Sequence, residues 1–105
     1  MRVKVVSTHP GEGVFPTFPK GTSVILGDGC THFINWYACD IEGHKTYIPD
    51  YFIKDGKLER DYNPTELVQE VGDILEVQEI VYAWLYAKND KNELGWIPAE
   101  NVVSV

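Results

Sequence analysis

The sequence predicts an all-β protein built from two small, closely packed β-barrels in tandem, with five short strands in each. An aromatic residue followed by Ile and Pro occurs twice, in TYIPDYFI at residues 46–53 and in GWIPAENV at residues 95–102. The strand-like runs between Gly and Pro residues are short, and no stretch offers ten residues of helical period. Closing a sheet into a barrel removes most of its exposed edges, so small barrels suit such short strands.

The composition is that of an ordinary globular protein, with 44% hydrophobic and 12% aromatic residues in a chain of 105. The longest apolar runs, VIL at 24–26 and IVYAWLYA at 80–87, are far shorter than the roughly 20 residues that span a bilayer. The opening residues MRVKVV do not resemble a secretory signal. Two cysteines make no disulfide framework. We therefore expect a cytoplasmic protein that does not engage a membrane.

The formal net charge is −7, of which −1 falls in residues 1–53 and −6 in residues 54–105. Binding of nucleic acid depends on a basic face that displaces counterions from phosphate, and this chain has no such excess of Lys and Arg. The charge therefore argues against nucleic acid as a partner. It favours basic partners, although acidity is also a simple route to solubility.

The repeat extends beyond the two prolines. Residues 35–39, NWYAC, align with residues 83–87, AWLYA, and residues 19–26 align with residues 70–77. The offsets of 48 to 51 residues indicate a repeated domain of about fifty residues. We therefore expect one domain over 1–53 and a second over 58–105. The four-residue link KDGK spans at most about 14 Å, so the two domains should touch.

The second repeat resembles a Src homology 3 (SH3) domain over its whole length, and the first resembles one more loosely. The arrangement is similar to that of small bacterial proteins built from two variant SH3 domains. In the second repeat the resemblance rests on LERDY at the Ala-Leu-Tyr-Asp-Tyr signature, ELVQEVGDILEV at the diverging turn and the next strand, WLYA at the Trp-Trp strand, and GWIPAENV at the Gly-x-x-Pro-x-x-Tyr-Val ending. In the first repeat it rests on FPKGTSVIL, NWYAC and YIPDYFI.

The resemblance implies binding of extended peptide or protein segments, proline-containing or basic, between aromatic ridges. By motif position, the ligand-binding residues of the second repeat are Tyr62, Trp84, Pro98 and Asn101, with Glu66 and Glu70 as acceptors for Arg or Lys. Those of the first repeat are Trp36, Pro49 and Phe52. Arg60 and Asn101 replace two groove tyrosines of the family, so the implied groove is incomplete.

These residues also have a structural interpretation. Strand alternation points Tyr37, Cys39 and Ile41, and likewise Leu85 and Ala87, into the barrels, which leaves both Trp36 and Trp84 on an outer face. Such a tryptophan either contacts a ligand or is buried against the sister domain. The two prolines also suit the start of a turn. The expected function is peptide or protein binding, and the alternative is a structural assembly protein whose aromatic faces mediate domain packing or homo-oligomerisation.

We expect neither catalysis nor a metal or other cofactor. Only Cys30, Cys39 and three histidines could serve as soft metal ligands or as a nucleophile with its base, and their spacing does not match a zinc site. Cys39 aligns with Ala87, an inward position where cysteine acts as a small buried hydrophobe. The segment FPTFP at 15–19 contains Pro-x-x-Pro, which could fill a groove, but the alignment assigns it to a loop.

Overall fold

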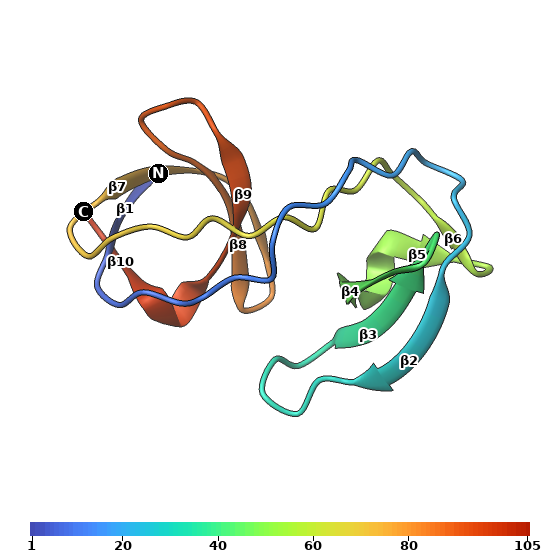
Figure 1. Ribbon diagram of the computed structural model, residues 1–105. Coiled ribbons are helices and arrows are strands. Elements are labelled where there is room, and N and C mark those ends of the chain that lie inside the picture. Colours follow the sequence, from blue (N-terminus) through green and yellow to red (C-terminus); the bar gives the residue numbers. More distant parts are fainter. The chain divides into compact units, whose positions relative to one another are not determined.

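The computed structural model describes residues 1–105 and is all-β, with several antiparallel sheets and helices of a single turn. No helix in the chain is both long and apolar enough to span a membrane. The elements, labelled in Figure 1, are β1 (Arg2–Val5), β2 (Ile25–Gly29), β3 (Trp36–Ile41), β4 (His44–Pro49), the 3-10 turn η1 (Asp50–Phe52), β5 (Ile53–Lys54), β6 (Lys57–Leu58), β7 (Ile74–Val81), β8 (Trp84–Lys88), β9 (Leu94–Pro98), the 3-10 turn η2 (Ala99–Asn101) and β10 (Val102–Ser104).

The chain folds into two compact units. The sequence of one unit is interrupted by the sequence of the other. The terminal unit consists of Met1–Gly13 together with Thr65–Val105, and the inserted unit consists of Val14–Pro64. These boundaries differ from the expected domains at 1–53 and 58–105. The first thirteen residues belong with the C-terminal repeat, because β1 pairs with strands from that part of the chain.

A five-stranded antiparallel sheet in the order β10-β1-β7-β8-β9 forms the terminal unit. β1 is an interior strand, since Val3 lies opposite both Ser104 of β10 and Leu75 of β7; in Figure 1 the blue β1 runs beside these two strands. Alternate residues of a strand face one side of a sheet, so Val3 and Val5 enter the core while their neighbours stay exposed. The core of this unit consists of Val3, Val5, Leu67, Leu75, Leu85, Ala87 and Ile97.

The inserted unit contains a three-stranded sheet in the order β2-β3-β4 and a small β5-β6 pair. Glu42 and Gly43 connect β3 to β4 with φ values of 52° and 85°, as the favoured two-residue hairpin turn requires. The unit begins and ends with adjacent chain segments. Phe18 and Tyr62 exchange both backbone hydrogen bonds, at 2.8 and 2.9 Å, so the entering and leaving segments lie side by side.

Both units share one local arrangement. Each has a meander of three antiparallel strands followed by a 3-10 turn and a short strand. Trp36 lies directly opposite Pro49 across β3 and β4, and Trp84 lies directly opposite Pro98 across β8 and β9. The Trp and Pro positions that align in the sequence therefore occupy matching cross-strand pairs.

Closed barrels were expected, but the strand pairings leave both large sheets open. β9 and β10 end the five-stranded sheet, and β2 and β4 end the three-stranded sheet. Residues 65–67 partly cover the edge of β9: the Leu67 N–H donates to the Trp96 carbonyl at 2.8 Å, and the Trp96 N–H donates to the Thr65 carbonyl at 3.0 Å. This pairing satisfies backbone groups that an uncovered edge would leave to solvent.

Candidate functional site

Trp84 is the predicted ligand-binding aromatic residue that keeps part of its ring exposed. It is half-buried at the start of β8, opposite the buried Pro98. The ring of His9 meets it edge-on, with ring centroids 6.2 Å apart and an interplanar angle of 80°. His9 comes from the segment after β1, so two distant parts of the chain build this surface of the terminal unit.

Asn101, three residues after Pro98, has a structural role. It is 7% exposed, its side-chain Nδ2 donates to the Ser7 carbonyl at 3.2 Å, and its own carbonyl accepts the Val6 N–H at 2.8 Å. These bonds tie the turn η2 to the segment after β1. The side chain that the resemblance placed in the groove is thus directed into the unit.

His9 and Glu66 form a close pair. The Nε2 atom of His9 lies 2.9 Å from Oε1 of Glu66, and each side chain is 13% exposed. The ring nitrogens are buried and are not aligned for a hydrogen bond, so the contact is an ion pair when the imidazole carries a proton.

Glu12 adds a second carboxyl group to this surface. Burial, together with the charge of the nearby Glu66, raises the pKa of Glu12 above its ordinary value of 4.5. We refer to His9, Glu12, Glu66 and Trp84 as the His9 cluster. It combines a partly exposed indole with two carboxyl groups, which is the chemistry that attracts an ammonium or guanidinium group.

Replacing Glu12 with Gln should stabilise the protein at neutral pH. The folded state binds the Glu12 proton more tightly than the unfolded state, so the contribution to stability is complete below pH 4.5 and is lost as the pH rises through the raised pKa. The urea midpoint of Glu12→Gln should therefore exceed that of the wild type at pH 7 and match it near pH 3.5. Glu59→Gln, at an exposed site in the inserted unit, is the control; an equal effect of both variants at pH 7 would contradict the assignment.

In the inserted unit, the predicted ridge residues are buried. Trp36 is 4% exposed and Phe52 is 0% exposed, and Pro49 is buried as well. Of the two alternatives for Trp36, ligand contact or burial, the structure therefore agrees with burial. Of the five predicted inward residues, Cys39, Ile41, Leu85 and Ala87 are buried, whereas Tyr37 is only partly buried.

Tyr62 belongs to this buried group and not to the surface of Trp84, with which the sequence had grouped it. Its ring packs edge-on against Phe52, with centroids 5.4 Å apart, and its hydroxyl donates to the Tyr47 carbonyl at 2.5 Å. The Arg60 guanidinium stands 4.2 Å above the centre of the Phe52 ring. Tyr62 lies in the inserted unit because it pairs with Phe18. This pairing holds the segment LERDY in that unit.

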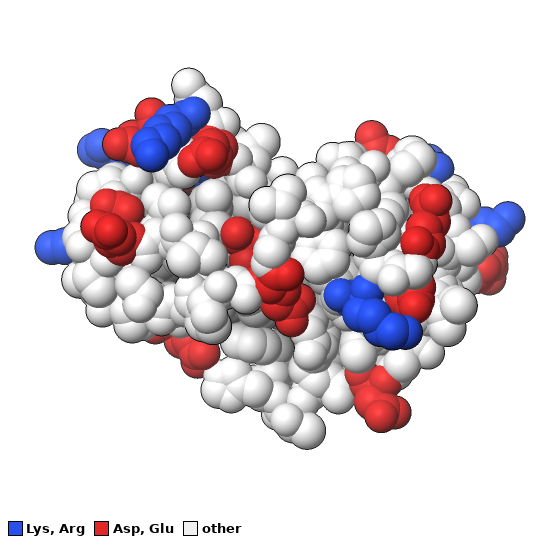
Figure 2. Space-filling view, viewed as in Figure 1, with Lys and Arg blue, Asp and Glu red and all other residues white.

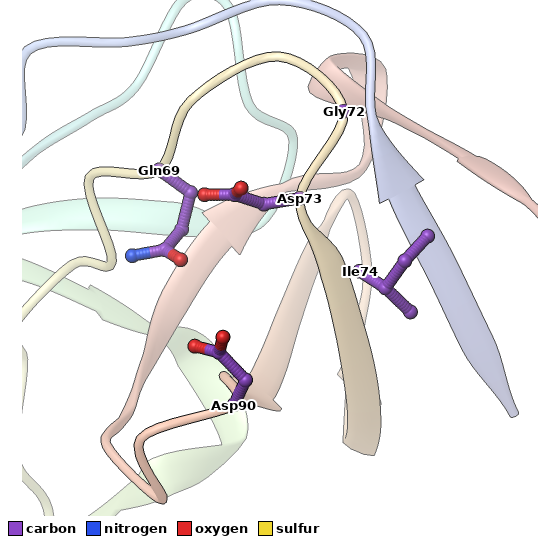
Figure 3. A pocket seen from close by; sticks show the side chains of 5 residues that line it. All are labelled: Gln69, Gly72, Asp73, Ile74 and Asp90. Atoms are coloured by element: carbon purple, nitrogen blue, oxygen red, sulfur yellow. The ribbon is translucent and has the colours of Figure 1, made fainter.

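The terminal unit also contains a cavity of about 240 Å³, lined by Gln69, Gly72, Asp73, Ile74 and Asp90. Figure 3 shows the carboxylates of Asp73 and Asp90 and the amide of Gln69 directed toward the same space. Asp73 also accepts the backbone N–H of Glu70 at 3.1 Å, so this carboxylate caps the turn before β7. None of the predicted ligand-binding residues lines the cavity.

Charge differs between the two units. The terminal unit has nine acidic and four basic residues, and the inserted unit has seven acidic and five basic residues. On the face shown in Figure 2, the cations are few and are scattered among carboxylates and uncharged surface. The acidic excess is therefore larger in the terminal unit than in the inserted unit.

The sequence does not mark His9 and Glu12 as members of this cluster. It points to His9 only as a metal ligand or a base, and it carries no signal for Glu12. Their position follows from the pairing of β1 with β7 and β10, for which the local sequence carries no signal. No protein-family model, curated protein or solved structure matches the chain.

Proposed function

We propose that the protein is a non-enzymatic binding module of the cytoplasm, with two SH3-like units, that recognises a basic segment of a peptide or protein on the terminal unit. The observation that carries this proposal is the partly exposed Trp84, set opposite Pro98 and joined through His9 to the carboxyl group of Glu66. The matching Trp–Pro pairs, each followed by a 3-10 turn, support the SH3-like assignment of both units.

The geometry suggests how a ligand would bind. An Arg or Lys side chain would lay its apolar stem on the indole of Trp84 and direct its charge to Glu66 and Glu12. Glu12 is exposed, and an exposed ion pair contributes only about 0.2 to 1 kcal/mol, so the indole supplies most of the affinity and the carboxyl groups select the cation. The acidic excess of the terminal unit would speed the encounter at low salt.

The inserted unit has a structural role in this proposal. Its aromatic residues Trp36, Phe52 and Tyr62 are buried, which favours a packing function over an open groove. This burial also supports the second candidate, an assembly protein whose aromatic faces hold domains or copies of the chain together. The two candidates predict different behaviour of Trp84: acrylamide should quench its fluorescence in a binding module, whereas a face buried in an oligomer should be protected.

Replacing Trp84 with Ala tests the binding function directly. An aromatic anchor contributes about 2 kcal/mol or more, so affinity for captured peptides should fall roughly 30-fold. The measurement is capture from an array of peptides that contain Arg, Lys and Pro, with circular dichroism as the check on folding. Tyr51→Ala is the control, because Tyr51 is 52% exposed and lies in the inserted unit. Undiminished capture by a folded Trp84→Ala variant would eliminate the proposal.

A further inference from the structure

Two segments connect the units: the outgoing one around Gly13 and the returning one around Thr65. The two segments contact each other within the terminal unit and again within the inserted unit. In the terminal unit, the outgoing segment contacts the returning one through the His9–Glu66 pair. Gly11 lies so close that a Cβ atom on it would stand 2.7 Å from the Cγ2 atom of Val68. In the inserted unit, Phe18 and Tyr62 exchange two backbone hydrogen bonds, and Asn63 donates from Nδ2 to the Thr17 hydroxyl at 3.1 Å.

We propose that the folded inserted unit acts as a clasp for the terminal unit: it holds the two connecting segments together and thereby stabilises the pairing of residues 1–13 with residues 65–105. This coupling does not depend on the proposed peptide binding. It follows from the topology, since the chain leaves the terminal unit after Gly13 and returns at Thr65.

The physical basis is the entropy of loop closure. When the inserted unit is folded, Phe18 is paired with Tyr62, and only about six residues separate this pair from the terminal unit, on the two connecting segments together. With the inserted unit unfolded, the terminal unit must close a loop of the 51 residues from Val14 to Pro64. Because the cost grows as (3/2)RT ln n, the unfolding equilibrium constant of the terminal unit should rise about 25-fold.

The His9 cluster would be the first part of the terminal unit to respond. His9 and Glu12 lie on the outgoing segment and Glu66 lies on the returning one, so their proximity requires the two segments to be together. The coupling is also reciprocal. Folding of the terminal unit restrains the ends of the inserted unit and stabilises it, in the way that a cross-link restrains an unfolded chain.

The experiment follows the three tryptophan indole signals by NMR during urea unfolding of the full chain. Trp36 reports on the inserted unit, and Trp84 and Trp96 report on the terminal unit. The test variant is Ile48→Ala, at a fully buried site of the inserted unit, and the matched control is Ile25→Ala, at a site of the same unit that is 71% exposed.

In Ile48→Ala, the Trp36 signal should be lost at lower urea, and the Trp84 and Trp96 signals should follow. At a urea concentration where only the variant's inserted unit is unfolded, the terminal unit should unfold with an equilibrium constant about 25 times that of the wild type. Ile25→Ala should move no signal. Terminal-unit signals that keep their wild-type midpoints after the Trp36 signal has gone would overturn the proposal. Should Ile48→Ala be unfolded without urea, Ile48→Val gives the same comparison with a smaller perturbation.

A second measurement separates loop closure from any other source of coupling. Twelve Gly and Ser residues inserted after Gly13 lengthen the connection in both states of the inserted unit. The coupling should then fall from about 25-fold to about 7-fold. A coupling that keeps its full size in this variant would overturn the clasp mechanism.

Discussion

Replacing Phe52 with alanine lowers the free energy of unfolding of the inserted unit by about 3 to 5 kcal/mol, the range measured for large aromatic side chains in protein cores. Phe52 is fully buried, its ring packs edge-on against Tyr62, and the Arg60 guanidinium lies over it. The substitution removes the contacts of Phe52 with both groups and leaves a cavity in the core.

Urea unfolding followed by the Trp36 signal measures this effect. Tyr51→Ala is the matched control, because Tyr51 is the neighbouring aromatic residue of the same 3-10 turn and is 52% exposed; its loss should cost much less. The comparison also decides between two roles for Phe52. If Phe52→Ala lost peptide capture with little loss of stability, the result would contradict the buried position of Phe52. It would support the ligand-binding role that the SH3 resemblance implies.

Replacing Gly95 with alanine should destabilise the terminal unit by roughly 1 to 3 kcal/mol or more, because an added methyl group overpacks this site. A Cβ atom on Gly95 would lie 2.8 Å from the Cγ atom of Leu67 and 3.0 Å from both the Leu67 nitrogen and the Thr65 carbonyl oxygen. Two of these three neighbours are backbone atoms that pair with β9. The returning segment must therefore move away from the sheet edge.

The effect should be visible as a lower urea midpoint of the Trp96 signal and as faster hydrogen exchange of the Leu67 amide, which donates to the Trp96 carbonyl. Gly29→Ala is the control, because a Cβ atom there meets only the Tyr37 ring at an ordinary 3.4 Å. Equal small losses in both variants would show that residues 65–67 do not pack on β9 as described.

Local features of the fold were predictable because they depend on neighbouring residues. The hairpin β3-β4 follows from a polar Glu-Gly turn between strand-forming runs, and the inward direction of Cys39, Leu85 and Ala87 follows from strand alternation. The equivalence of Trp36 and Trp84 followed from the repeat, since each precedes its Ile-Pro by a similar interval.

Long-range pairing was not predictable in the same way. In RVKV, charged and apolar residues alternate, a pattern found in both edge and interior strands. This pattern does not indicate that Val3 lies between Ser104 and Leu75. Tyr62 stands between the two repeats in the sequence, so its motif fits the start of the second repeat as well as the end of the first. Parity identifies the face to which Trp36 belongs but not what covers that face, so the sequence leaves ligand contact and burial open, and only the structure shows burial.

The insertion has a consequence for biosynthesis. β1 is translated before the inserted unit, yet its partners β7 and β10 come after that whole unit. At about 5 to 20 residues per second, the 41 residues from Thr65 to Val105 need roughly 2 to 8 s. During that interval the nascent chain can already fold Val14–Pro64, while RVKV remains an unpaired strand. β1 therefore stays an unpaired strand, open to other strands, until the residues that follow the inserted unit are made.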